Sequence, residues 1–174
     1  MNLFEFTPQK NAKKLTQVTG LLFIGAAVLM VMTMLLPNIP YRWAVQLLSV
    51  GMLAMGIFIM TRYVMKSFVY AVIKTDDGND FTVTEIQNRH TVTVCRIGMS
   101  SIEKVFVADI NDKQTDSDIK KLIKADKRKK FNYCADLFAQ KYVCIFSCEA
   151  GTPIAIKLTW DESLEAVFNV KEEE

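Results

Sequence analysis

The chain has 174 residues, of which 51% are hydrophobic and 23% are charged, and its formal net charge is +2. This length allows one ordinary domain and a small appendage. Mean hydropathy is positive despite the many charges. An even mixture of the two kinds of residue is therefore excluded, and apolar and charged residues must be segregated along the chain.

Two long apolar stretches lie in the first third of the chain. No charge occurs between residues 15 and 41, or again between 43 and 61. A helix rises about 1.5 Å per residue and a bilayer core is about 30 Å thick, so roughly 20 apolar residues are needed to cross it. The sequence therefore predicts transmembrane helices at 15–36 and 43–65.

Two other interpretations of these stretches fit less well. The apolar core of a cleaved signal peptide runs only about 7–15 residues, which is shorter than the stretch at 15–36. Two buried helices of a soluble protein would need a larger protein around them, because neither stretch has a polar face.

The residues around the two stretches predict their orientation. Pro37 and Pro40 end the first helix and favour a tight extracytoplasmic turn at 37–42. Arg42 is the only basic residue of this turn, whereas five flank the outer ends of the stretches: Lys10, Lys13, Lys14, Arg62 and Lys66. Because basic residues are enriched on the cytoplasmic side, we expect a multi-pass protein of the cell membrane with both termini cytoplasmic.

This topology places two segments in the cytoplasm: residues 1–14, and a β-rich domain at 66–174 with a C-terminal helix at 160–170. All cysteines fall in the second segment, where thiols are kept reduced, so no structural disulfide is expected. They are Cys95, Cys134, Cys144 and Cys148.

The apolar stretches contain no ionisable side chain, so a proton or ion pathway is not expected. They do contain small residues, which allow membrane helices to approach closely. The candidate helix-packing residues are Gly20, Gly25, Ser49, Gly51, Ala54 and Gly56. Two alternatives stay open: the small residues pack the hairpin against itself, or they assemble the chain into a homo-oligomer.

After residue 65 the apolar pattern changes to a period of two, which is typical of strands. An acidic turn at 76–80 and short turns at 88–89 and 149–151 separate several of these segments. Strands are predicted at 68–74, 81–87, 90–97, 102–108, 131–134, 141–148 and 152–158.

Two segments of the domain do not follow the strand pattern. Residues 115–130 have aspartates early and basic residues late, the charge order that suits a helix dipole, so a short helix or a mobile basic loop is predicted there. Residues 160–170 form an amphipathic pattern. Thr159 and Glu162 have the spacing of a capping box at its start.

About seven short antiparallel strands closed by a C-terminal helix is the element order of a pleckstrin-homology-like (PH-like) barrel. A hairpin containing WAVQLLSVGMLAMGIFIM, strands such as FVYAVIK and FTVTEIQ, and a terminal TWDESLEAVF helix together resemble the small bacterial membrane proteins that carry a PH-like domain. The resemblance covers most of the chain through the order of its elements. It implies a membrane α-helical hairpin joined to a mainly β, α+β domain, and no catalytic residues. A split β-sandwich or another partly open barrel fits the same pattern.

The strongest charge feature is a run of basic residues in the later part of segment 115–130. On a domain tethered beneath a membrane, such a run is attracted to anionic lipid by roughly 1 kcal/mol per residue close to the surface. A solvated face that only aids solubility, or a surface for an acidic protein, are the alternatives. Nucleic acid is not expected as a partner, because the run lacks base-stacking aromatics. The candidate lipid- or partner-binding residues are Lys120, Lys121, Lys124, Lys127, Arg128, Lys129 and Lys130.

No metal, cofactor or catalytic residue is predicted. Cys144 and Cys148 lie four residues apart on a predicted strand, about 13 Å at the strand rise, which is too far to share a zinc ion with bonds of about 2.3 Å. His90 is the only histidine, and no nucleophile signature accompanies it. We therefore expect a non-enzymatic, membrane-anchored module that binds anionic lipid or a protein. The alternative is a structural subunit of a membrane complex assembled through the hairpin.

Overall fold

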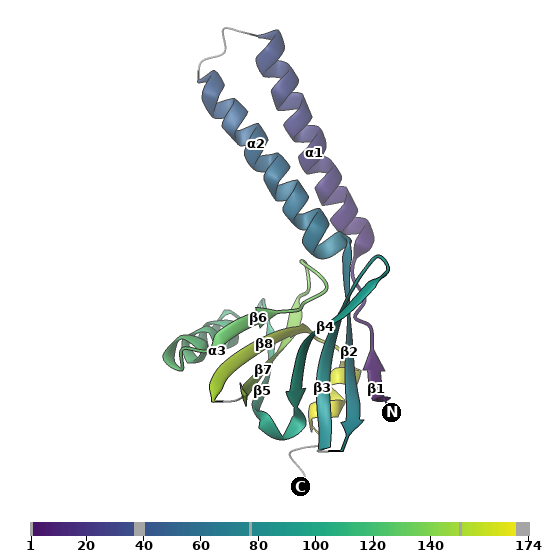
Figure 1. Cartoon of the computed structure of the whole chain (residues 1–174). Coiled ribbons are helices and arrows are strands. Elements are labelled where there is room, and N and C mark those ends of the chain that lie inside the picture. The colour runs from purple at the N-terminus through teal and green to yellow at the C-terminus, as the bar shows by residue number, and fades with distance from the viewer. Residues whose placement is uncertain (1, 37–40, 77, 150, 170–174) are drawn as a thin grey trace. The chain divides into compact units, whose positions relative to one another are not determined.

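The computed structural model describes residues 2–36, 41–76, 78–149 and 151–169. It divides into two compact units (Figure 1). One unit is a helical hairpin at Asn11–Lys66, and the other combines Met1–Lys10 with Ser67–Glu174. The second unit, here called the β-rich unit, therefore contains segments from both sides of the hairpin.

The helical hairpin consists of α1 (Ala12–Leu35) and α2 (Arg42–Ile59), the latter extended by a π-helical turn η1 (Met60–Val64). The Asn11 side chain accepts a hydrogen bond from the Lys14 amide at 3.2 Å, as an N-cap residue does. Spans of 24 and 23 residues, each only 17% buried in its apolar window, are long and apolar enough to cross a membrane. The prolines of the predicted turn, at 37 and 40, lie outside the described residues.

The first sheet of the β-rich unit has the strand order β1-β2-β3-β4. Strands β2 to β4 match three predicted strands, and their bounds are Lys66–Thr75, Gly78–Gln87 and His90–Gly98. Strand β1 (Asn2–Phe6) was not predicted. It pairs antiparallel with β2, with Phe6 opposite Tyr70.

The second sheet has the strand order β5-β7-β8-β6. A 3-10 turn, η2 (Met99–Ser101), leads into it from β4. Its strands are β5 (Ile102–Asp109), β6 (Lys129–Asn132), β7 (Lys141–Glu149) and β8 (Thr152–Thr159). The expectation of antiparallel strands throughout is wrong for one pair, because β6 runs parallel to β8.

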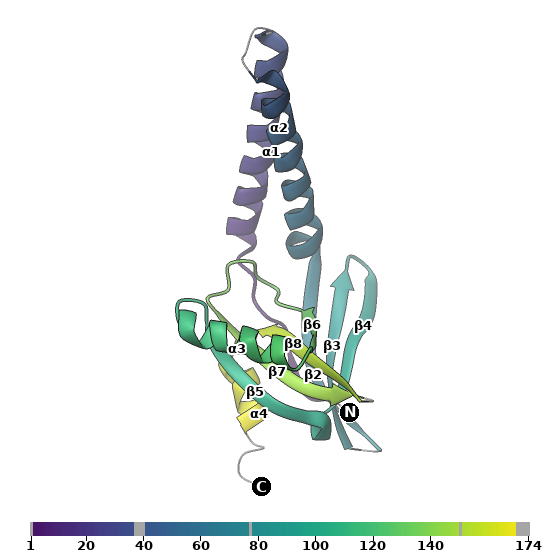
Figure 2. The same ribbon diagram turned by 90° about the vertical axis from the view of Figure 1, so that its left-hand side faces the viewer.

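Helix α3 (Lys113–Ala125) explains this parallel pair. It connects β5 to β6, which are the two edge strands of the second sheet. Because the chain crosses the whole sheet through this helix before β6 begins, β6 can run parallel to its neighbour β8. The helix lies against one face of that sheet (Figure 2), where Ile119 and Ile123 are buried with Ala108 and Phe146. Of the segment 115–130, predicted as a short helix or a mobile loop, residues 115–125 belong to this packed helix, and the rest form a turn and the start of β6.

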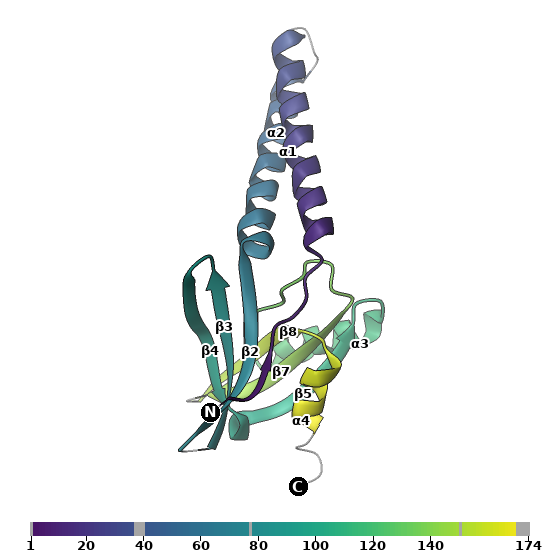
Figure 3. The ribbon, with the colours of Figure 1, turned by 90° about the vertical axis from the view of Figure 1, so that its right-hand side faces the viewer.

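The main core of the β-rich unit draws on both sheets and on α4 (Glu162–Asn169), seen in Figure 3. Phe81 from the first sheet, Ile156 from the second and Leu164 from α4 are fully buried there. The eight described strands form two four-stranded sheets and not a closed barrel. The architecture is α+β with two membrane-length helices.

The helix start at α4 differs from the predicted capping box. Asp161 is the residue whose carboxylate accepts from the Ser163 amide, at 2.9 Å. Thr159 ends β8 instead, and its hydroxyl accepts from the Ala135 amide at 2.9 Å. The spacing of Thr159 and Glu162 was therefore misleading, because the strand continued one residue further than predicted.

Candidate functional site

The basic run predicted as a binding surface begins on the outer side of α3. Asp112 starts this helix by accepting a hydrogen bond from the Gln114 amide at 3.2 Å. Ile119 and Ile123 of the helix pack on the sheet, which leaves its basic side chains toward solvent. Lys120, Lys121 and Lys124 are all exposed.

Two of these lysines have carboxylate neighbours on the same helix. Lys120 pairs with Asp116 one turn earlier, and Lys121 pairs with Asp118 at 2.9 Å. The lysine side chains are 62% and 74% exposed. Such exposed pairs contribute only about 0.3–0.5 kcal/mol each, so they hold the lysines loosely and leave them accessible to a partner.

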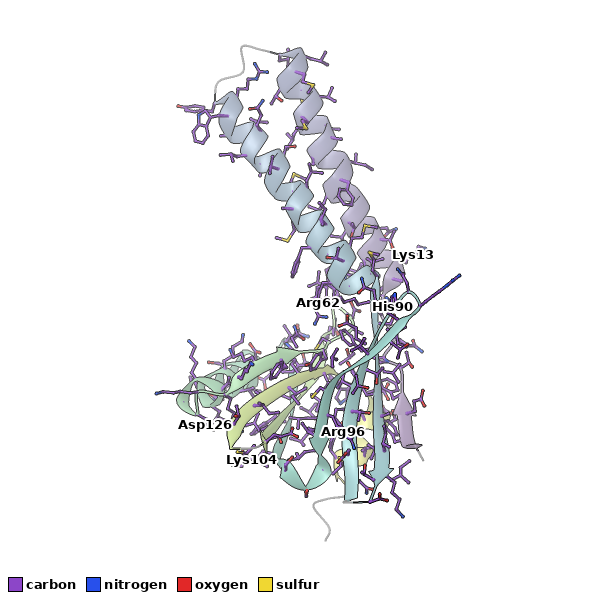
Figure 4. The ribbon with its side chains drawn as sticks, viewed as in Figure 1. Lys13, Arg62, His90, Arg96, Lys104 and Asp126 are labelled. Atoms are coloured by element: carbon purple, nitrogen blue, oxygen red, sulfur yellow. The ribbon has the colours of Figure 1, made fainter. Side chains whose placement is uncertain are left out.

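Arg128 differs from the rest of the run. Its side chain is only 10% exposed and forms ion pairs with Glu103 at 2.7 Å and Asp126 at 2.9 Å. Its guanidinium lies 4.6 Å from the centroid of the Phe146 ring, a favourable cation–π distance. Figure 4 labels Asp126 at the end of α3. Arg128 thus fastens the end of α3 to the sheet and is not part of the exposed surface.

The remaining basic residues of the run lie in the turn after α3 and on β6, and all are exposed. Lys127 has a φ of 51° and forms the turn itself. Lys129 has its ammonium 5.3 Å from the Phe131 ring centroid. We define the basic surface as the six exposed members of the run: Lys120, Lys121, Lys124, Lys127, Lys129 and Lys130.

A cavity of about 200 Å³ lies between α3 and the second sheet. We call it the α3 pocket. Its polar lining comprises Asp116, Lys120, Lys130, Asn132, Tyr142 and Lys157, and its other walls are mostly apolar. Sequence reasoning missed Tyr142 and Lys157, because nothing in an alternating strand shows which polar side chain faces a helix from elsewhere in the chain.

Asp116 and Tyr142 form the polar wall of the α3 pocket beside the helix. The Tyr142 hydroxyl donates to the Asp116 carboxylate at 2.6 Å. Hydrogen bonds from Lys120 and Tyr142 lower the pKa of Asp116 below its usual value. Burial, and then the hydrogen bond to Asp116 and its charge, raise the pKa of Tyr142. At neutral pH the pair is therefore a carboxylate and a neutral phenol.

Two of the cysteines, partly buried Cys95 and buried Cys144, are poor nucleophiles. Burial raises the pKa of the Cys95 thiol to about 11 and that of the Cys144 thiol to about 12. Both groups are protonated at neutral pH, and the thiolate is the reactive form. Among the described residues no group of three His, Cys, Asp or Glu side chains is placed to hold a metal ion.

The hairpin brings together only some of the predicted packing residues. Ser49 is fully buried and donates to the Ala26 carbonyl of α1 at 2.9 Å. Side chains of α1 and α2 pack onto the two glycines of the contact: a Cβ at Gly56 would lie 3.2 Å from Phe23, and one at Gly25 would lie 2.7 Å from Met52.

The other three predicted packing residues lie outside this contact. A Cβ at Gly20 or Gly51 would meet no other residue within 4 Å, and Ala54 is exposed. The small residues of the hairpin therefore form two groups, one inside the helix–helix contact and one on its outer surface.

Comparison with known proteins adds no relative: no family model, no curated protein and no solved structure matches the chain. Any functional assignment therefore depends on the geometry of the two units.

Proposed function

We propose that the chain is a non-enzymatic, membrane-anchored binding module whose β-rich unit contacts anionic lipid through the basic surface. The observation that carries this proposal is the placement of six exposed basic side chains on a packed helix and the strand after it. The unit that holds them is joined by a continuous chain to two helices of membrane length. A tether of this kind keeps a basic surface near lipid, where each charge contributes roughly 1 kcal/mol.

The pairing of β1 with β2 supports a hairpin with both ends on one side of a membrane. These strands precede α1 and follow α2, and they are hydrogen-bonded neighbours in one sheet. A chain that crossed the membrane an odd number of times between them could not form this sheet. Figure 4 shows Lys13 and Arg62 at the same end of the hairpin. By the positive-inside rule we place this end, and both termini, in the cytoplasm.

We further propose that the β-rich unit is a divergent PH-like domain. Two four-stranded sheets share a core with a C-terminal helix, which supports the proposal. The α3–β6 segment, which adds a parallel edge strand, is then an insertion between the strands of the second sheet. The basic surface lies on this insertion.

The lipid proposal is tested with the full chain in nanodiscs. Hydrogen exchange of α3 amides is measured in neutral and in anionic nanodiscs, at low and high salt. The variant Lys121→Glu, Lys124→Glu, Lys127→Glu is compared with the control Lys74→Glu, Arg89→Glu, Lys104→Glu, which alters exposed basic residues elsewhere in the β-rich unit. Both variants change three positive charges to negative ones.

We expect α3 amides to exchange more slowly in anionic nanodiscs than in neutral ones. Salt should reduce the difference because it screens exposed charges, with a Debye length of about 10 Å at 0.1 M. The Lys121/Lys124/Lys127 variant should abolish the difference and the control should retain it. Equal exchange in both lipids would refute lipid contact and direct the search to an acidic protein.

A second candidate function, a structural subunit of a membrane complex, is favoured by the outer small residues of the hairpin. An apolar groove on α1 and α2 is lined by Leu22, Leu47, Gly51 and Met55. Small residues let a second helix approach closely in lipid. If this groove holds a partner helix, Gly51→Leu should reduce the mass of a detergent-solubilised complex measured by light scattering. An unchanged mass would argue against assembly through this face.

A further inference from the structure

The α3 pocket carries an excess of positive charge. It is lined by Lys120, Lys130 and Lys157 against the single carboxylate of Asp116. Asp116 is already bound by Lys120 and by the Tyr142 hydroxyl. Among the described residues, neither Lys130 nor Lys157 forms an ion pair. Two lysines that line the pocket therefore carry charges that no ion pair balances.

The strand register brings these two ammonium groups to one face of the sheet. Strands β6 and β8 are parallel neighbours, with Lys130 opposite Ala155 and Asn132 opposite Lys157. Residues two apart on a strand share a face, so Lys130, Asn132 and Lys157 all line the same pocket. Asn132 adds an amide to the two positive charges.

Lys157 is held in place by an aromatic ring. Its ammonium lies 3.5 Å from the centroid of the Tyr142 ring, and that ring is fixed in turn by the hydrogen bond from its hydroxyl to Asp116. Tyr142 and Cys144 are both protonated at neutral pH, because their pKa values are raised. They consequently do not cancel the charge of the lysines.

The size of the pocket limits what it can hold. Sites for drug-sized ligands measure about 300–1,000 Å³, whereas this cavity measures about 200 Å³. It suits a compact anionic group better than a whole organic cofactor. A phosphate monoester carries about −1.5 to −2 charges at pH 7, which matches the two unpaired ammonium groups.

We propose that the α3 pocket binds one phosphate monoester group through Lys130 and Lys157. Lysine binds phosphate as a point charge, and Asn132 lines the pocket beside the two lysines. The same group occurs on a soluble phosphate ester and on a lipid headgroup such as phosphatidic acid. This inference adds a ligand to the proposed function. Binding of a lipid phosphate rests on that function, whereas binding of a soluble phosphate ester does not.

The experiment measures how fast individual lysines of the full chain in nanodiscs react with an amine-acylating reagent, as read by mass spectrometry. One arm adds glycerol 3-phosphate to nanodiscs of phosphatidylcholine. A second arm replaces part of the phosphatidylcholine by phosphatidic acid, and a third uses oleate to give the same surface charge without a phosphate monoester. Chloride at matched ionic strength is the reference for screening, and exposed Lys104 is the internal control.

We expect Lys130 and Lys157 to react roughly tenfold more slowly at a ligand concentration of ten times Kd, because only about one pocket in eleven is then empty. Lys104 should be unaffected. Protection by glycerol 3-phosphate indicates a soluble ester, and protection by phosphatidic acid alone indicates a lipid. No protection in either arm, or equal protection by chloride or oleate, would overturn the proposal.

Two variants complete the test. Lys157→Met keeps an apolar stem on Tyr142 but removes the charge, so protection of Lys130 should be lost, whereas Lys104→Met should preserve it. The wild-type measurement stands even if Lys157→Met does not fold. The Lys121/Lys124/Lys127 variant lies outside the pocket lining and should still be protected by glycerol 3-phosphate. Loss of lipid contact with the basic surface can therefore be told apart from loss of phosphate binding in the α3 pocket.

Discussion

The two units of the chain pack their interiors with opposite kinds of residue. The contact between α1 and α2 centres on Ala26, Ser49 and Gly56, all of them buried. The core of the β-rich unit centres on large aromatic side chains, among which Phe68 is 1% exposed and Tyr70 and Phe81 are fully buried. Meanwhile the hairpin turns its large apolar residues outward.

This contrast follows from the solvent that each unit requires. In water, burial of apolar surface stabilises a fold by about 25 cal/mol per Å², so large side chains belong inside. In lipid that driving force between helices is absent, and close packing of small residues with interhelical hydrogen bonds takes its place. Small residues inside and large apolar residues outside agree with the membrane location proposed for the hairpin.

The largest expected effect comes from removing bulk in the β-rich unit. Phe81 packs against Tyr70 and against Phe168 of α4, with ring centroids 6.4 and 5.4 Å apart. Phe81→Ala should lower the free energy of unfolding of this unit by about 3–5 kcal/mol, as measured by chemical denaturation in detergent. A loss below 1 kcal/mol would mean that the two sheets do not share this core.

Adding bulk should be the damaging change in the hairpin. Gly56→Leu places a side chain against Phe23, whereas Gly51→Leu meets open space. We expect Gly56→Leu to destabilise the helix pair by about 1–3 kcal/mol, as measured by steric trapping in bicelles. Gly51→Leu is the matched control and should leave the pair unchanged. Equal effects of the two substitutions would contradict the described contact.

Loss of the hydrogen bonds to Asp116 should have a smaller, pH-dependent effect on the stability of the β-rich unit. Asp116→Asn weakens the hydrogen bonds from Lys120 and Tyr142 and should cost about 1 kcal/mol at pH 7. Because the pKa of Asp116 is lowered in the folded state, its contribution is complete above the usual pKa of about 3.9 and is lost as the pH falls through the lowered value.

Denaturation curves of Asp116→Asn and wild type between pH 7 and pH 2 measure this difference. The two proteins should converge at the acid end, where the wild-type carboxyl is protonated as well. Asp118→Asn is the matched control, since Asp118 pairs only with exposed Lys121 among the described contacts. A difference that stayed constant over the whole pH range would show that charge is not its source.

The smallest expected effect is that of the hydrogen bond between the helices. Ser49→Ala preserves the small size but removes the bond to the Ala26 carbonyl. Interhelical hydrogen bonds in membranes average about 0.6 kcal/mol, and steric trapping should show a loss of that size. A loss comparable to that of Gly56→Leu would mean that polar contact, and not close packing, dominates the hairpin.

Elements with a strong local pattern were predictable. The two apolar helices and the strands β2 to β5, β7 and β8 follow from length, charge and a period of two. Strand β1 was missed because its five residues are too few to show a pattern and their partner lies beyond the hairpin. The parallel placement of β6 was missed for a similar reason, since nothing local to Lys129–Asn132 specifies β8 as its neighbour.

The candidate site was predictable only as a set of charges. The run from Lys120 to Lys130 is evident in the sequence, but the burial of Arg128 depends on Glu103, which comes from another strand. The α3 pocket likewise depends on Tyr142 and Lys157, which reach it from β7 and β8. Pairings between distant strands determine both, and these are long-range properties that a local pattern does not contain.

The pairing of β1 with β2 also has a consequence during synthesis. The Lys10 ammonium donates to the Ser67 hydroxyl, 57 positions further along the chain; β1 precedes Lys10, and Ser67 lies at the start of β2. At about 5–20 residues per second, translation takes roughly 3–11 s to cover that distance, although a β-hairpin forms within about 10 μs. Strand β1 therefore waits for its partner while α1 and α2 are made, and the first sheet can close only after both helices have been synthesised.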